Sequence, residues 1–166
     1  MKLLNVNKNK FVLILAILVV SIVIMRFFDS YLKNEICKNG IVSFELAKNL
    51  SVSKNIINSW NSEAKTFANY SLYFDFIFLT IYSFFIAILI HKTKFRIKKV
   101  FIYTIFTAAF FDIIENVALL NLTHNNLNQL WTSIAFYSAT IKFTLIIVSL
   151  VYLIVSVFVK LFKTNR

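Results

Sequence analysis

The chain has no proline, one glycine and one cysteine among its 166 residues. A soluble domain of this length is about half apolar and is punctuated by glycine and proline turns, whereas 59% of these residues are hydrophobic. The single cysteine, Cys37, excludes an intramolecular disulfide and a metal site built on two cysteines. The composition therefore predicts an integral membrane protein, with Gly40 as its one marked break.

Acidic residues are also scarce, with seven Asp and Glu against eighteen Lys and Arg and a net charge of +11. Such a charge can indicate a nucleic-acid partner, but the basic residues gather at the ends of apolar runs and form no continuous face. The motifs of nucleotide-binding loops, zinc proteases and serine hydrolases are missing. His91 and His124 are too isolated to predict a metal site. We therefore expect no nucleic-acid partner, nucleotide or metal.

Four apolar runs are long enough to cross a membrane, because about 20 helical residues span a hydrocarbon core about 30 Å thick. Strands would need a larger set of shorter, alternating runs. The last run exceeds what a perpendicular helix needs, so it should tilt or project from the membrane. We predict a single all-α membrane domain over residues 1–166, a four-helix bundle with spans at about 11–28, 72–90, 100–120 and 131–159.

Lys and Arg in the short connections predict the orientation of the spans. They cluster without acidic residues before the first span, between the second and third spans, and after the last span. These residues are Lys2, Lys8, Lys10, Lys92, Lys94, Arg96, Lys98, Lys99, Lys160, Lys163 and Arg166. The connection 121–130 contains no Lys or Arg. Both termini are therefore predicted to be cytoplasmic. The abundance of Lys, Asn, Ile and Phe suggests a bacterium with an AT-rich genome, and hence the plasma (inner) membrane.

The first connection, 29–70, is extracytoplasmic in this topology. Apolar residues recur in it at helical spacing, at Ile56, Ile57, Trp60, Ala64 and Phe67. Ser51 or Ser53 is the expected cap at the start of this helix. We predict an amphipathic helix that lies on the outer membrane surface and runs into the second span, with Trp60 at the interface.

Four charged residues lie within the spans: Asp75, Asp112, Glu115 and Lys142. Each ionised side chain costs about 2.5 to 3.5 kcal/mol in hydrocarbon. Counted from the cytoplasmic ends, all four lie at one level in the outer half of the membrane. Asp112 and Glu115 are three residues apart and share a helix face, with Asn116 beside them. We predict that Lys142 pairs with this face.

Three carboxylates and one ammonium leave two negative charges uncompensated in a medium of low dielectric. Arg26, at the outer end of the first span, is a candidate partner for one of them. Protons, water or a cationic ligand would compensate the remaining negative charge. Asp75, Asp112, Glu115, Asn116 and Lys142 are therefore candidates to line a polar pocket open to the outer leaflet.

Four residues are candidates for the rim of this pocket, and Arg26 is one of them. Tyr82 lies in the second span, two turns inward of Asp75. Glu45 is expected to be solvated, and the alternative is that it covers the mouth of the pocket while Trp60 anchors that lid. Two further alternatives stay open. The charged group only holds the helices together, or Asp75 lies at the membrane interface.

Several of these residues form an ordered pattern: Phe44-Glu45-Leu46-Ala47, Trp60, Asp75-Phe76, Asp112-x-x-Glu115-Asn116 and Lys142. The pattern resembles a group of small, uncharacterised bacterial membrane proteins with four spans, which carry FELA, LDF and LD-x-x-EN segments. Phe74 and Phe111 stand where that group has leucine, and neither difference alters a polar group. The resemblance implies four spans and emphasises these residues, but it implies no activity and no cofactor.

Three classes of function remain open from the sequence. The first is binding or conduction of a cation, a proton or an amphiphilic ligand. The second is an intramembrane enzyme that uses the carboxyl groups as acid and base on a lipid-like substrate. The third is a structural or assembly subunit in a homo-oligomer or a larger membrane complex. The lipid bilayer is the one partner that the composition itself implies.

The predicted orientation can be tested by chemical labelling. A cysteine introduced into the second connection, 92–99, of a Cys37→Ser chain should resist a membrane-impermeant thiol reagent in intact cells, because this connection is predicted to be cytoplasmic. The same cysteine should react after the cells are permeabilised. Labelling in intact cells would contradict the predicted orientation.

Overall fold

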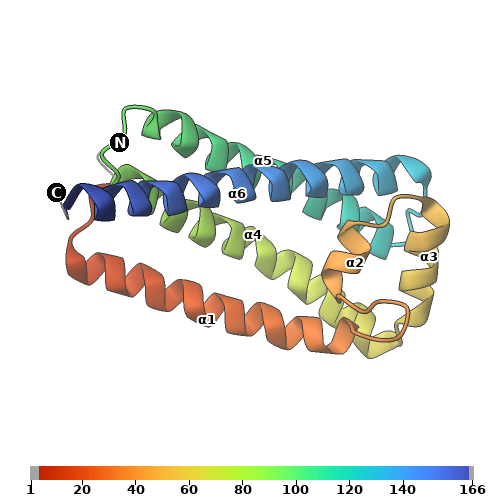
Figure 1. The fold of residues 1–166 in the computed structure, drawn as a ribbon. Coiled ribbons are helices and arrows are strands. Elements are labelled where there is room, and N and C mark those ends of the chain that lie inside the picture. The colour runs from red at the N-terminus through yellow and green to blue at the C-terminus, as the bar shows by residue number, and fades with distance from the viewer. Residues whose placement is uncertain (1–3, 165–166) are drawn as a thin grey trace.

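The computed structural model describes residues 4–164, which fold into six helices without a β-strand (Figure 1). The helices are α1 (Lys8–Leu32), α2 (Ile41–Glu45), α3 (Leu50–Ser59), α4 (Ser62–His91), α5 (Lys98–Thr123) and α6 (Gln129–Thr164). Two of the basic residues that predict the orientation, Lys2 and Arg166, lie outside the described residues, and so does the side chain of Lys163.

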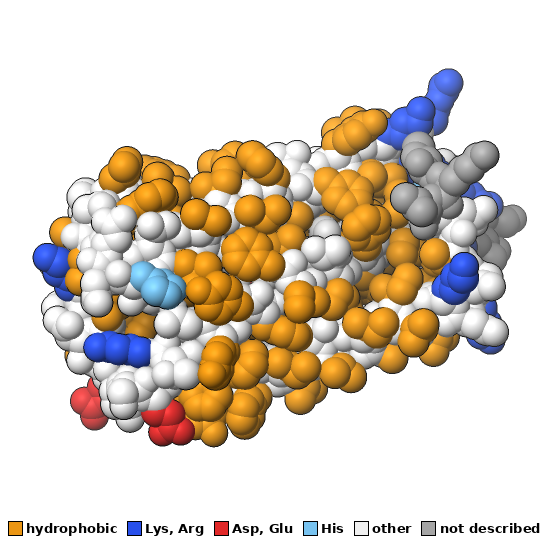
Figure 2. All heavy atoms as spheres, turned by 180° about the vertical axis from the view of Figure 1, so that it is seen from behind, with side chains coloured by type: hydrophobic (Ala, Val, Ile, Leu, Met, Phe, Trp, Pro, Cys, Tyr) orange, Lys and Arg blue, Asp and Glu red, His pale blue; other side chains and the backbone are white. Residues whose placement is uncertain are grey.

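Four helices, α1, α4, α5 and α6, are long and apolar enough to cross a membrane. The mean hydropathy of their most apolar stretches runs from 1.6 in α5 to 2.9 in α1. Each helix also extends beyond the predicted span, and α4 begins ten residues before position 72. Apolar side chains cover much of the middle of the molecule in Figure 2, and charged side chains gather at its two ends. The prediction of an all-α protein with four candidate membrane spans is confirmed.

The long helices pack in chain order, with α1 against α4, α4 against α5, and α5 against α6. Figure 1 places both described chain ends and the α4–α5 connection at one end of the molecule, and α2 and α3 at the other. Helix α1 is peripheral, because only Ser21 and Leu32 of its 25 residues are buried. The core that positions the polar residues is therefore built mainly from α4, α5 and α6.

Asparagine side chains begin four of the helices. The caps are Asn7, Asn49, Asn61 and Asn128, and each accepts a hydrogen bond of 2.7 to 3.1 Å from the backbone N–H three residues later. Such a cap typically contributes about 1 kcal/mol. The expected cap at Ser51 or Ser53 was wrong, because α3 begins at Leu50 after Asn49.

The predicted amphipathic helix is divided into two. Helix α3 ends at Ser59, Trp60 has extended backbone angles, and Asn61 caps the start of α4. The apolar residues Ile56 and Ile57 of α3 are buried within the protein. Helix α3 therefore covers the end of the helix assembly, and the expectation that its apolar side lies on a membrane surface was wrong.

The short helix α2 is held against the last turn of α1. Asp29 Oδ1 accepts a hydrogen bond of 2.8 Å from the Ile41 backbone N–H, and Asp29 Oδ2 lies 3.1 Å from Lys33 Nζ. Gly40 precedes α2 with φ 58° and ψ −135°, a conformation that suits glycine almost alone. A Cβ atom at position 40 would overlap the Asp29 carboxylate. Glycine is therefore required where the chain turns into α2.

Gly40→Ala should displace α2 while the four long helices persist. The positive φ angle costs a non-glycine residue about 1 to 3 kcal/mol, and the overlap with Asp29 adds to that cost. Thermal unfolding in detergent micelles should show a lower midpoint, and the buried Cys37 should react faster with a maleimide. Asn39→Ala is the matched control at a neighbouring position with ordinary φ, and it should behave as the wild type. An unchanged midpoint together with an unreactive Cys37 in Gly40→Ala would contradict this role.

Candidate functional site

A layer of polar side chains separates two apolar cores of the protein. On α4 one core ends at Leu72 and the other begins at Leu79, and Asp75 lies between them. We call this layer the Lys142 cluster, and each of its residues is at most 8% exposed. Its members are Glu45, Asp75, Tyr82, Asp112, Glu115, Asn116 and Lys142. The prediction that Asp75, Asp112, Glu115 and Lys142 lie at one level along the helices is confirmed.

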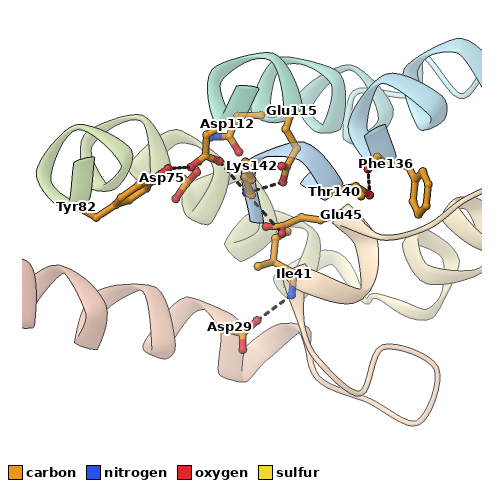
Figure 3. Close-up of polar contacts among 11 residues, drawn as sticks. Asp29, Ile41, Glu45, Asp75, Tyr82, Asp112, Glu115, Phe136, Thr140 and Lys142 are labelled. Carbon is orange, nitrogen blue, oxygen red and sulfur yellow. Dashed lines mark hydrogen bonds and ion pairs between the residues drawn. The ribbon is translucent and has the colours of Figure 1, made fainter. Parts of the chain in front are cut away.

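Lys142 lies at the centre of the cluster (Figure 3). Its Nζ atom donates to Asp112 Oδ1 at 2.7 Å and to Glu115 Oε1 at 2.8 Å, so α6 is joined to two residues one turn apart on α5. These are short, charge-assisted hydrogen bonds inside an apolar protein. The predicted pairing of Lys142 with Asp112 and Glu115 is confirmed.

Two further hydrogen bonds join α4 to α5. The Tyr82 hydroxyl donates to Asp112 Oδ2 at 2.8 Å, so both oxygens of Asp112 have a donor. The Asn116 amide donates to Asp75 Oδ2 at 2.6 Å. Asp75 is buried and faces α5, so its carboxyl group is not exposed on the outside of the helix bundle. Tyr82, proposed for the pocket rim, lies within the cluster itself.

Glu45 reaches the cluster from outside the long helices. It is the last residue of α2, and its Oε2 atom lies 3.6 Å from Lys142 Nζ. The side chain is buried, so the expectation of a solvated glutamate was wrong. Burial raises the pKa of Glu45 above its ordinary value; the Lys142 ammonium opposes this rise and the Asp112 carboxylate adds to it.

Trp60 and Arg26 were the other two rim candidates, and they differ in their placement. Trp60 is buried, and its indole Nε1 donates to the Leu32 carbonyl oxygen at 3.0 Å. Its ring packs edge-to-face against Phe44, with 5.3 Å between the ring centroids. It thereby ties the segment that carries Glu45 to the end of α1. Arg26 is exposed on α1, and within residues 4–164 it forms no ion pair with the cluster.

Two buried carboxyl oxygens have no hydrogen-bond donor: Glu45 Oε2 and Glu115 Oε2. The two carboxyl groups flank the same ammonium, with Glu115 Oε1 at 2.8 Å and Glu45 Oε2 at 3.6 Å from Lys142 Nζ, and a carboxyl group offers a donor only when it is protonated. With all four carboxyl groups ionised, the cluster would contain four negative charges and one positive charge. Buried polar atoms are normally paired and buried charges compensated, so both observations point to a missing positive species.

The residues of the cluster are buried within the protein, and the groove that the structure shows lies elsewhere. A shallow groove between α5 and α6 is apolar and contains no cluster residue; its lining is Phe101, Ile147, Val148, Val151, Tyr152 and Val155. Among the described residues, no three His, Cys, Asp or Glu side chains are arranged to hold a metal ion. The Lys142 ammonium itself stands between the carboxyl groups, where a metal ion would have to bind.

Comparisons of the chain with protein-family models, with curated proteins and with solved structures found no match. The resemblance to small four-span bacterial proteins stays a prediction.

A double-mutant cycle tests the pairing of Lys142. Lys142→Met should lower the free energy of unfolding by about 3 to 5 kcal/mol, because it leaves buried carboxylates without their counter-charge. Lys142→Met combined with Asp112→Asn should be less destabilised than the single change, since one unpaired charge is removed as well. Denaturant titration in detergent micelles measures both values.

Lys65→Met is the control for this cycle, because it removes a lysine that is exposed on α4. Its free energy of unfolding should stay close to that of the wild type. Simple additivity of the Lys142 and Asp112 substitutions would show that the two side chains are not energetically coupled.

Proposed function

We propose that the chain is a multi-pass protein of a bacterial plasma membrane that binds and releases a proton at the Lys142 cluster. In the orientation favoured by its Lys and Arg, both termini are cytoplasmic and α2 and α3 are extracytoplasmic. The cluster then lies in the outer half of the membrane, and Glu45 approaches it from the outer side. Of the ligands considered from the sequence, which were a cation, a proton and an amphiphile, the proposal therefore selects the proton.

The observation that carries this proposal is the excess of carboxyl groups around one ammonium. Glu45, Asp75, Asp112 and Glu115 surround or adjoin Lys142, and two carboxyl oxygens have no donor. A proton is the one cation that needs no cavity, so the packed arrangement favours it over a metal ion or an amphiphile. A protonated carboxyl group also gains the O–H donor that the unpaired oxygens lack.

The hydrogen bonds support two of the carboxyl groups as the proposed sites of the proton. Asp112 receives one donor on each oxygen, from Tyr82 and Lys142, and Asp75 receives one from Asn116. Glu115 receives Lys142 on one oxygen only, and Glu45 approaches Lys142 without a hydrogen bond of its own. Glu45 and Glu115 are therefore the proposed proton acceptors, and Lys142 with Tyr82 orients Asp112 beside them.

A structural anchor is the second candidate, because Lys142 joins α6 to α5 and Asn116 joins α5 to α4. An anchor made of ionised groups would leave negative charge uncompensated, because the four carboxyl groups exceed the single ammonium. An intramembrane enzyme would have to admit a lipid-like substrate to Asp75, Asp112 or Glu115, which are all buried by protein. Proton binding accounts for both the charge and the packing.

Infrared spectroscopy tests the proposal directly. The purified protein in micelles should show the stretching band of a protonated carboxyl group at neutral pH, where a solvated Glu or Asp is ionised. Glu45→Gln and Glu115→Gln should each weaken this band, because each removes one partner of the shared proton. Raising the pH should remove the band from the wild type.

Glu63→Gln is the matched control, since Glu63 is exposed in the first turn of α4 and lies outside the cluster. Its spectrum should equal that of the wild type. A wild-type spectrum without a protonated carboxyl band at neutral pH would refute proton binding and leave the anchor as the better explanation.

A further inference from the structure

Glu45 is the only cluster residue that does not belong to a membrane-spanning helix. Helix α2 has five residues, and it is held at its start by the Asp29 hydrogen bond to Ile41 and at its end by the burial of Glu45 beside Lys142. The other carboxyl groups of the cluster are carried by α4 and α5, each 26 residues or longer. Helix α2 is therefore the element that a change in the charge of the cluster can move most readily.

The charged groups around Glu45 come from several elements. Lys142 of α6 attracts it, and Asp112 and Glu115 of α5 and Asp75 of α4 are acidic neighbours. Asp29 of α1, paired with Lys33, lies at the opposite end of α2. The only charged residue of α3, Lys54, is exposed. Once Glu45 ionises, it has one positive neighbour and up to three negative ones.

We propose that a proton shared between the carboxyl groups of Glu45 and Glu115 seats α2 over the Lys142 cluster, and that loss of this proton lifts α2 and exposes the cluster to water. This inference rests on the proposed proton binding and adds the element that the proton controls. In the seated state one O–H donor satisfies the unpaired oxygens of the two glutamates. After deprotonation, a buried carboxylate regains its hydration only if α2 moves outward.

The direction of the pH dependence follows from linkage. Burial raises the pKa of Glu45 while α2 is seated, whereas a solvated Glu45 on a lifted α2 would have its ordinary value. The seated state therefore binds the proton more tightly, so seating is complete at low pH. It is lost as the pH rises through the raised pKa of the seated state.

The single cysteine of the chain is a built-in reporter of this movement. Cys37 is fully buried, and its thiol donates to the Gly40 carbonyl oxygen at 3.0 Å, directly before α2 begins. Burial also raises the pKa of the thiol, which slows its reaction further while α2 is seated. Movement of α2 should expose Cys37 to a water-soluble maleimide without any engineered residue.

The experiment measures the labelling rate of Cys37 in the purified full chain, in micelles, from about pH 6 to about pH 9. The thiolate fraction itself rises with pH, so the rate of the wild type is divided by that of Glu45→Gln at each pH. The amide that replaces the carboxyl group in this variant cannot ionise and can donate to Glu115, so the variant should keep α2 seated throughout. The ratio should be close to one at the acidic end and should rise about tenfold or more at the alkaline end.

Glu35→Gln is the matched control, because Glu35 is an exposed acid two residues from Cys37. Its rate should follow that of the wild type over the whole range. Glu115→Gln is a second test variant in case Glu45→Gln does not fold. Its amide N–H replaces the shared proton as a permanent donor to Glu45, so Cys37 should stay protected at alkaline pH.

A ratio that stays constant over the pH range would overturn the inference, and so would faster labelling of Glu45→Gln than of the wild type at every pH. The infrared band separates the two proposals. A constant ratio with a protonated carboxyl band present refutes only the control of α2, whereas absence of the band refutes proton binding and this inference together.

Discussion

The arrangement of this protein depends on the Lys142 ammonium and its two hydrogen bonds to Asp112 and Glu115. They form in the polar layer between two apolar cores, where an unpaired charge would be costly. Lys142 holds α6 against α5. Its ammonium is also the positive charge beside which Glu45 of α2 is buried. Without this ammonium, four carboxyl groups would meet in one buried layer with no positive partner.

A single glycine and several asparagines determine how the segment between α1 and α4 reaches this layer. Gly40 turns the chain so that Asp29 receives the first N–H of α2, and Trp60 ties the following segment to Leu32. The asparagine caps begin and separate the helices in a chain without proline. A short segment outside the long helices thereby contributes Glu45 to a site whose other residues belong to candidate membrane-spanning helices.

Part of the site could be predicted because helix geometry converts sequence spacing into position. The depths of Asp112, Glu115 and Lys142 follow from the rise per residue, and the shared face of the two acids follows from their spacing of three. The burial of Glu45 could not be predicted, since it depends on the chain direction after Gly40. Trp60 fitted a helical pattern of apolar residues, but the cap at Asn61 ends that pattern and starts a new helix.

The sequence by itself determined an all-α chain with four membrane-length helices and charged residues at one depth, because hydrophobic length and helical rise are local properties. It also determined that the acids outnumber the intramembrane lysine. Only the tertiary structure decided which oxygens receive a donor, that Arg26 stays outside the cluster and that Glu45 lies inside it. These contacts join residues far apart in the chain, and the packing of α2, α4, α5 and α6 decides their distances and burial.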